Sequence, residues 1–343
     1  MLGVATMTTT SLKRAAVSIF GLLFLAAAMS SASRAQDASP VELVDALNGV
    51  FGKHPGMRTS HAKGFCVSGQ FTPAADAASL SKAPHFAKPV PVLGRFSMGG
   101  GNPKAADNSK GARGLALRFD LGDGASSDLV TISVPLFFAK TPAQVVEFLK
   151  VRTPAEGADK PDPEKIKAFS DANPETTRQG AWLNARPVSA SYAGTSYFGI
   201  HAFTLTNADG KETLIKLKIT PTNGEENLTD EEAEAKGPDF LEGELTERLT
   251  KGPASFDLVA ILGRDGDPTD DPTLRWEGED DRPTAALGTI EIEALAPNEK
   301  CDAITFLPTN LPEGIASPAD DLVFPARAGA YVVSLSRRNA PAP

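Results

Sequence analysis

One of the four histidines in this 343-residue sequence, His61, lies in the polar run GMRTSHAKGFC (56–66) between Arg58 and Lys63. Imidazole titrates near neutral pH, so histidine is the side chain most often used to take and return a proton in catalysis. A core histidine usually has apolar neighbours, whereas these neighbours are polar and cationic. We therefore interpret His61 as a candidate acid–base residue whose partners must come from elsewhere in the chain.

A second candidate is Tyr331, which has Arg327 four residues before it and Arg338 seven residues after it in a helical pattern. These spacings place the three side chains on one helix face. A cation beside a buried tyrosine favours the phenolate, and one use of a phenolate in proteins is to hold a haem iron. Taken alone, the helix favours the simpler interpretation of a core tyrosine with two surface arginines.

Signatures of other enzymes and sites are absent or incomplete. The glycine run SMGGGNPK (97–104) lacks the lysine spacing of a P-loop, and the chain has no serine-elbow or HExxH motif. The acidic run 263–283 has Asp270 where a calcium-binding EF-hand loop needs glycine, and Trp276 where it needs glutamate. We expect this run to be a solvated acidic loop.

The candidate residues must be positioned by the predicted secondary structure, which consists of many strands with few helices between them. The predicted helices are 41–52, 141–152, 162–172, an acidic stretch 229–252 interrupted at Gly237-Pro238, and a C-terminal helix starting at Ser317-Pro318. The predicted strands are 64–73, 91–100, 114–122, 128–138, 254–263 and 284–295, with a hairpin formed by 196–206 and 211–221. This order predicts an α+β fold, an antiparallel β-barrel or sandwich decorated with helices, in one domain.

Residues 1–35 have the pattern of a signal peptide. Lys13 and Arg14 precede the apolar run 15–29, and small residues lead to a cleavage position after Ala35. The apolar run is too short to span a bilayer comfortably, which disfavours a retained membrane anchor. We expect an exported domain of residues 36–343.

The exported chain is strongly acidic. Removing the signal peptide changes the net charge from −9 to −12, because 31 basic residues then face 43 acidic ones. We therefore expect neither nucleic acid nor a membrane as a partner. Two cysteines remain, Cys66 and Cys301, and an oxidising compartment would permit a disulfide. Pairing depends on their separation in space, so the sequence leaves it open.

Together, these segments resemble the haem catalase superfamily, and in particular its small exported members, the catalase-related peroxidases. RTSHAKG (58–64) resembles the distal-histidine motif of the family. The other matching segments follow in the family's order: VPVLGRFS (90–97), ARGLALRF (112–119), DLVTISVPLFF (128–138), DPTLRW (271–276), FLPTNLPEGI (306–315) and ARAGAY (326–331). The resemblance runs from about residue 42 to 338. It implies the catalase-like haem barrel, without the C-terminal helical and nucleotide-binding region of full catalases.

The resemblance implies a role for each candidate residue. His61 is the distal base, and Ser97 orients its ring. Tyr331 is the axial ligand of the haem iron, and Arg327 stabilises its phenolate. The other implied cofactor contacts are Arg58, Arg95 and Arg338 for the haem propionates, and Phe137 against the haem face. The implied cofactor is haem b.

The sequence departs from the family pattern in the distal strand and in the C-terminal helix. Where family catalases have asparagine, within a Gly-Asn-Asn-Thr-Pro run, this chain has Ile132. Isoleucine cannot donate a hydrogen bond to a peroxide oxygen, and the adjacent Ser133 points to the opposite face of a strand. Pro325 is expected to break or restart the C-terminal helix just before Arg327.

The expected function is that of a periplasmic haem peroxidase with weak or no catalase activity. It would reduce hydrogen peroxide, or an organic hydroperoxide, with an external electron donor that the sequence does not identify. The alternatives are a true catalase, a lipid-hydroperoxide-rearranging enzyme of the allene oxide synthase type, and a non-enzymatic haem-binding protein. The missing asparagine and the predicted export disfavour the rearranging enzyme. The oligomeric state stays open between monomer and homodimer.

Overall fold

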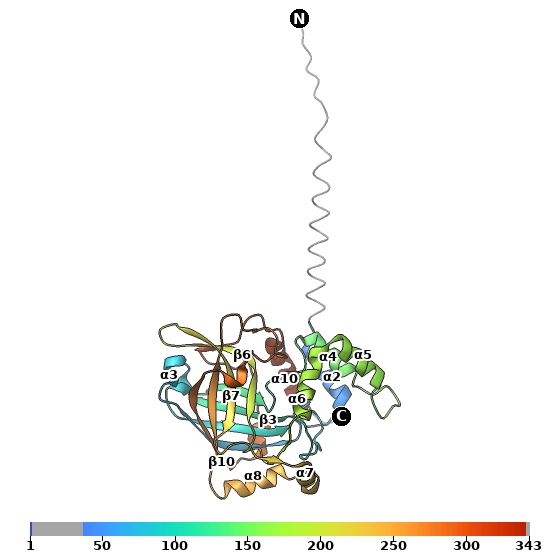
Figure 1. Cartoon of the computed structure of the whole chain (residues 1–343), viewed down its shortest axis with the longest axis horizontal. Coiled ribbons are helices and arrows are strands. Elements are labelled where there is room, and N and C mark those ends of the chain that lie inside the picture. Colours follow the sequence, from blue (N-terminus) through green and yellow to red (C-terminus); the bar gives the residue numbers. More distant parts are fainter. Residues whose placement is uncertain (2–36, 341–343) are drawn as a thin grey trace. The chain divides into compact units, whose positions relative to one another are not determined.

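Eight antiparallel strands close into a barrel in this computed structural model, which describes Met1 and residues 37–340 (Figure 1). The strand order is β6-β4-β3-β2-β1-β10-β9-β7, and β7 pairs back with β6 to close the barrel. The barrel strands are β1 (Gly64–Pro73), β2 (Val90–Met98), β3 (Arg113–Gly122), β4 (Ala125–Ile132), β6 (Tyr197–Thr206), β7 (Glu212–Pro221), β9 (Ala254–Leu262) and β10 (Thr284–Leu295). The prediction of a helix-decorated antiparallel barrel is confirmed, while the predicted signal peptide lies outside the described residues.

Side chains alternate across each strand and give the barrel two different faces. Phe96 of β2 and Leu115 of β3 point into the apolar interior and are fully buried. Their neighbours Arg95, Ser97 and Gly114 point outward instead, and all three line a cavity on the outer face. One alternating pattern therefore builds the core and the floor of a site at the same time.

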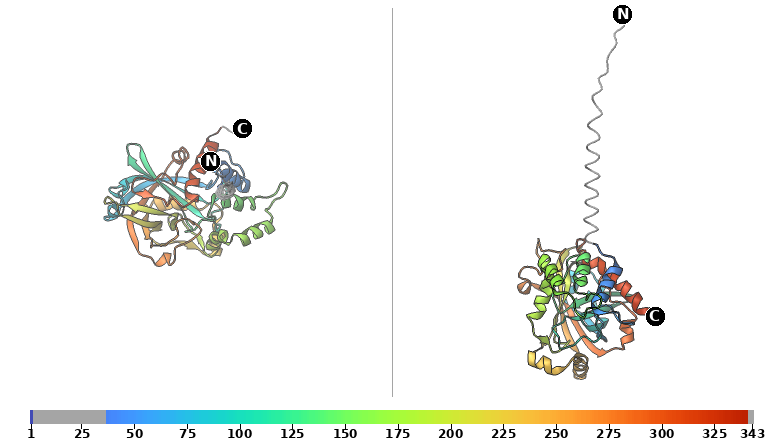
Figure 2. Two further views of the ribbon diagram at one scale, coloured as in Figure 1. Left: turned by 90° about the horizontal axis from the view of Figure 1, so that it is seen from above. Right: turned by 90° about the vertical axis from the view of Figure 1, so that its right-hand side faces the viewer.

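Helices gather on one side of the barrel. Helix α2 (Pro40–Phe51) packs against α4 (Pro142–Lys150) and α10 (Val323–Asn339), with α5 (Pro163–Ala172) and α6 (Arg178–Asn184) on the same side in Figure 1. The views in Figure 2 show the same grouping. The remaining elements are α3 (Ala77–Leu80), α7 (Asp230–Lys236), α8 (Leu241–Leu249), α9 (Asn298–Asp302), and the short strands β5 (Val188–Ser189), β8 (Asn227–Leu228) and β11 (Ile315–Ala316). No helix in the described part of the chain is long and apolar enough to cross a membrane.

The C-terminal helix starts later than the sequence predicts. Helix α10 begins at Val323 rather than at Ser317. The reason is the buried Asp321, whose Oδ1 accepts the backbone N–H groups of the first two helical residues at 2.9 and 3.0 Å. Pro325 falls in the first turn, where its missing N–H leaves no helical hydrogen bond unmade. The helix break predicted at this proline is therefore wrong.

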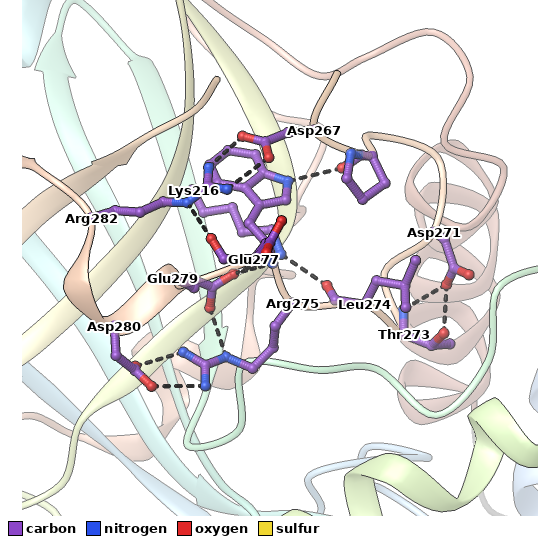
Figure 3. Close-up of polar contacts among 12 residues, drawn as sticks. Lys216, Asp267, Asp271, Thr273, Leu274, Arg275, Glu277, Glu279, Asp280 and Arg282 are labelled. Atoms are coloured by element: carbon purple, nitrogen blue, oxygen red, sulfur yellow. Dashed lines mark hydrogen bonds and ion pairs between the residues drawn. The ribbon is translucent and has the colours of Figure 1, made fainter. Parts of the chain in front are cut away.

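The acidic run 263–283 is solvated only in part: most of its carboxylates are exposed, as the sequence predicts, but one is buried. Its Glu279 is 5 % exposed and accepts a hydrogen bond at 3.1 Å from Lys216 of β7, which is equally buried (Figure 3). Arg282 forms a two-point ion pair with Asp267 in the same network. Burial lowers the pKa of Lys216, while the Glu279 carboxylate opposes that shift. The Lys216–Glu279 pair joins the run to β7. The Arg282–Asp267 pair joins two parts of the run to each other.

The buried pair gives a stability prediction. A Glu279→Gln variant is expected to unfold at lower urea concentration, with a loss of about 3 kcal/mol, because it leaves the buried Lys216 cation without a counter-charge. The matched control is Asp280→Asn, which removes an exposed carboxylate that also pairs with Arg275, and it is expected to cost about 1 kcal/mol or less. Equal losses in the two variants would mean that the buried network does not hold the run.

Candidate functional site

A cavity of about 410 Å³ lies on the outer face of β2, β3 and β4 and is bordered by α2, α4 and α10. This volume is within the range of pockets that enclose small ligands and cofactors. Every site residue predicted from the sequence lines this one cavity. They are Arg58, His61, Arg95, Ser97, Phe137, Arg327, Tyr331 and Arg338.

His61 lies in the turn just before β1 and is held in a single orientation. Its Nδ1 is 3.0 Å from Ser97 Oγ, which leaves Nε2 as the ring nitrogen available for a proton. Its backbone has φ of 55°, a left-handed conformation that costs free energy for a non-glycine residue. The buried Arg95 stabilises this turn by donating to the carbonyl oxygens of His61 at 2.9 Å and Ala62 at 3.1 Å.

The surroundings of His61 keep its ring neutral. Burial, together with repulsion from the nearby cations Arg95, Arg327 and Arg58, lowers its pKa to about 4. The residue packed against the ring, Gly114, must also lack a side chain. A Cβ atom at Gly114 of β3 would lie 2.7 Å from Ser97 Oγ and 2.8 Å from His61 Nδ1. The result is a neutral, oriented imidazole that can accept a proton.

Tyr331 lies on α10, which forms the helical border of the cavity. Arg327, one turn earlier on the same helix, donates a hydrogen bond of 2.8 Å to the Tyr331 hydroxyl oxygen. The predicted pairing of these two side chains is therefore present. A donated hydrogen bond from a permanent cation stabilises negative charge on that oxygen.

The structure adds two residues that the sequence did not identify, His201 and Asp321. Arg327 lies 2.9 Å from Nε2 of His201, whose Nδ1 is 2.5 Å from Asp321 Oδ2. Both residues are almost completely buried, at 2 % and 1 % exposure. Asp321 also caps α10, so a chain of polar contacts fixes Arg327 against Tyr331. The signal in the sequence was a polar histidine, His201, within an apolar strand. No local pattern linked it to Asp321, which lies 120 residues later.

Three arginines form a cationic end to the cavity. Arg95 and Arg338 are only 6 % and 8 % exposed. Burial, together with repulsion from Arg58, lowers their pKa values to about 9 and about 10, while the Asp302 carboxylate opposes both shifts. The nearby carboxylate in the described part of the chain is that of Asp302, 2.5 Å from Arg58. Three cations with one carboxylate leave an excess of positive charge that suits an anionic ligand.

Much of the remaining lining is apolar, including the strand position where family catalases have asparagine. Ile132 faces the cavity, as do Phe137 and Phe138, whose rings are 4.3 Å apart. Ser133 points away, and its hydroxyl oxygen accepts the backbone N–H of Arg113 at 2.9 Å. The expectation that Ser133 points to the face opposite Ile132 is therefore confirmed.

The lining fits a haem. Tyr331 offers a single oxygen donor, Gly114 and its neighbour Ala116 leave a flat floor, and the arginines match two carboxylates. The Nε atom of Arg338 is buried and has no hydrogen-bond partner. No cluster of three or more His, Cys, Asp or Glu residues that could hold a separate metal ion occurs among the residues described.

Comparison with known proteins finds matches over most of the chain. The profile of the catalase family matches residues 41–341. A catalase-related peroxidase of Synechococcus elongatus is 37% identical over 303 residues, which cover 88% of each chain. One of Mycolicibacterium paratuberculosis is 35% identical over 88% of this chain and 95% of its own length.

Solved structures show the same fold. Catalase A of Saccharomyces cerevisiae has a TM-score of 0.74 at 22% sequence identity, over 84% of this chain and 62% of the yeast protein. The chain thus spans less than two thirds of that catalase. Members of the matched family bind haem and act on peroxide. From its barrel, its cavity and these matches, the chain belongs to the catalase family.

Proposed function

We propose that this protein is a haem peroxidase that reduces hydrogen peroxide with an external electron donor. The observation that carries the proposal is that one cavity contains a neutral, oriented histidine and an arginine-bonded tyrosine, while Ile132 occupies the distal strand. The proposed cofactor is haem b, and a haem without thioether bonds agrees with the disulfide that joins both cysteines of the chain. Tyr331 would be its iron ligand, and Arg58, Arg95 and Arg338 would face its propionates.

When bound, the haem supplies the iron centre that takes oxidising equivalents from peroxide. His61 Nε2 accepts a proton from one peroxide oxygen and returns it to the oxygen that leaves as water, which is general acid–base catalysis. Ser97 keeps the ring in the orientation that this transfer requires. Arg327 donates to the Tyr331 oxygen and orients it, with His201 and Asp321 fixing the guanidinium.

The substrate preference follows from the apolar distal lining. Ile132 offers no hydrogen bond to position a second peroxide molecule, so an external reductant returns the enzyme to its resting state. The same apolar lining accommodates an organic hydroperoxide as well as hydrogen peroxide, since Phe137 and Phe138 present hydrocarbon surface to the cavity. Peroxidase turnover should therefore exceed dismutation.

We also propose that the protein acts in the periplasm. The basic and apolar pattern of residues 1–35 supports this location. The disulfide between Cys66 and Cys301 gives independent support, because such bonds persist in oxidising compartments and are rare in the cytosol.

An Ile132→Asn variant tests the division between peroxidase and catalase. The haem-loaded wild type is expected to oxidise a phenolic donor with peroxide and to release little oxygen without a donor. The variant should release oxygen about tenfold faster, because one positioned hydrogen bond is worth up to about 1.5 kcal/mol. Oxygen is measured with an electrode, and Ile132→Val is the matched apolar control.

Two outcomes would contradict the proposal. Rapid oxygen release by the wild type without a donor would identify a true catalase. Stoichiometric haem without peroxide turnover, tried with several donors, would identify a non-enzymatic haem-binding protein.

A further inference from the structure

Helix α9 is joined to the barrel beside the cationic end of the cavity. Cys66 of β1 lies directly opposite Arg95 of β2 in the strand register, and it is disulfide-bonded to Cys301 in α9. The backbone N–H of Cys66 also donates to Asn298 Oδ1 at 2.8 Å, and its carbonyl accepts from Ala296 at 2.9 Å. The disulfide thus places α9 against β1, next to the β2 position that carries Arg95.

The residues that α9 brings there hold the other two arginines. Arg58 donates to the Cys301 carbonyl at 2.7 Å and pairs with the Asp302 carboxylate at 2.5 Å. Arg338, at the end of α10, donates to the carbonyls of Asp302 and Ile304, each at 3.1 Å. Two guanidinium groups from opposite ends of the chain therefore rest on one four-residue segment, 301–304.

We propose that the Cys66–Cys301 disulfide is a positioning bond for the anion-binding end of the cavity. It fixes the segment that aims Arg58 and Arg338, and so it sets the affinity of the cavity for a tetrapyrrole with two carboxylates. This role rests on the proposed haem function.

The physical reason is that α9 is short and is attached to β1 by the disulfide and only a few hydrogen bonds, such as that from Cys66 to Asn298. It has five residues, far fewer than a helix needs to persist by itself. Its apolar contacts form a small cluster in which Cys66, Cys301 and Phe306 are the buried members. Without the bond, the carbonyl groups of 301–304 move with the segment, and two long arginine side chains lose the partners that orient them. Ordering those side chains again on binding weakens the affinity for the ligand.

The test compares two iron-free ligands, protoporphyrin IX and its dimethyl ester, which differ only in the two carboxylates. Both are titrated by fluorescence into the wild type and into a Cys66→Ala/Cys301→Ala variant, so the readout is independent of enzyme activity. The variant is expected to bind the diacid about tenfold more weakly and to bind the diester with unchanged affinity, since two side chains must be ordered anew. An Arg338→Gln variant is the positive control and should show the same selective loss.

Reduction of the wild type gives the same comparison without any substitution, should the double variant fail to fold. Dithiothreitol supplies two electrons and two protons, turns the disulfide into two thiols, and closes into its own cyclic disulfide. The reduced protein should again lose affinity for the diacid only. An unchanged ratio of the two affinities, or equal weakening of both ligands, would overturn the positioning role while leaving the haem function intact. A wild type that binds neither porphyrin would overturn the haem function, and the positioning role with it.

Discussion

A Tyr331→Phe variant is expected to lose haem binding more completely than any other single substitution in the cavity. The change removes the oxygen that Arg327 holds at 2.8 Å and that we propose as the iron ligand. Loss of a residue that merely supports a metal ligand typically costs about 10–100-fold in affinity. Loss of the ligand itself should therefore exceed about 100-fold, and peroxidase activity should fall with it.

Ultraviolet–visible spectra of the two proteins after addition of haem provide the measurement. The wild type should show a high-spin ferric spectrum with phenolate ligation, and the variant should lose that signature. The matched control is Tyr192→Phe, because Tyr192 is buried in the barrel core and does not line the cavity. A Tyr331→Phe variant with an unchanged spectrum would show that Tyr331 is not the iron ligand.

A His61→Ala variant is expected to keep its haem and to lose peroxide turnover by about 10²–10⁴-fold, the usual contribution of a general acid–base residue. The loss should appear in the second-order rate constant for peroxide, measured by stopped-flow spectroscopy. A His54→Gln variant serves as the control, since His54 lies on the preceding loop outside the cavity lining. A rate constant that survives the loss of His61 would remove this residue from the mechanism.

The pH dependence of the wild type follows from the same residue. The pKa of His61 is lowered to about 4, so the ring is neutral and able to accept a proton at every pH above that value. The rate constant for peroxide should stay level from neutral pH downward and fall only as the pH drops through about 4. A fall centred near 6.5, the value of an unperturbed histidine, would show that burial and the neighbouring arginines do not act on this ring.

The sequence alone determined the elements and most of the site. Alternating strands with few crossover helices predict an antiparallel barrel or sandwich, because a strand with one apolar face must bury that face, and the family resemblance selected the barrel. The side chain of Thr141 accepts the backbone N–H of Gln144 in the first turn of α4, so a purely local signal placed this helix start. The spacing of Arg327 and Tyr331 also fixed their contact, since residues four apart on a helix are neighbours.

Where long-range contacts decide the outcome, local patterns gave wrong or open answers. The run 263–283 is acidic, and the sequence predicts a solvated loop. Lys216, far from the run in sequence, nevertheless forms a buried ion pair with Glu279 of this run. Asp321 moved the start of α10 because its partner His201 lies on a barrel strand 120 residues earlier. The pairing of Cys66 with Cys301, 235 residues apart, likewise stayed open.

The residue types and their local order in this chain therefore determined its strands, its helices and the identity of its catalytic candidates. Only the tertiary structure decided that His201 supports Arg327, and that one short segment, 301–304, carries both Arg58 and Arg338. The physical reason is the closure of the barrel. Pairing of β6 with β7 closes the sheet, and the packing of α9 and α10 on the closed barrel brings these distant side chains within hydrogen-bonding distance.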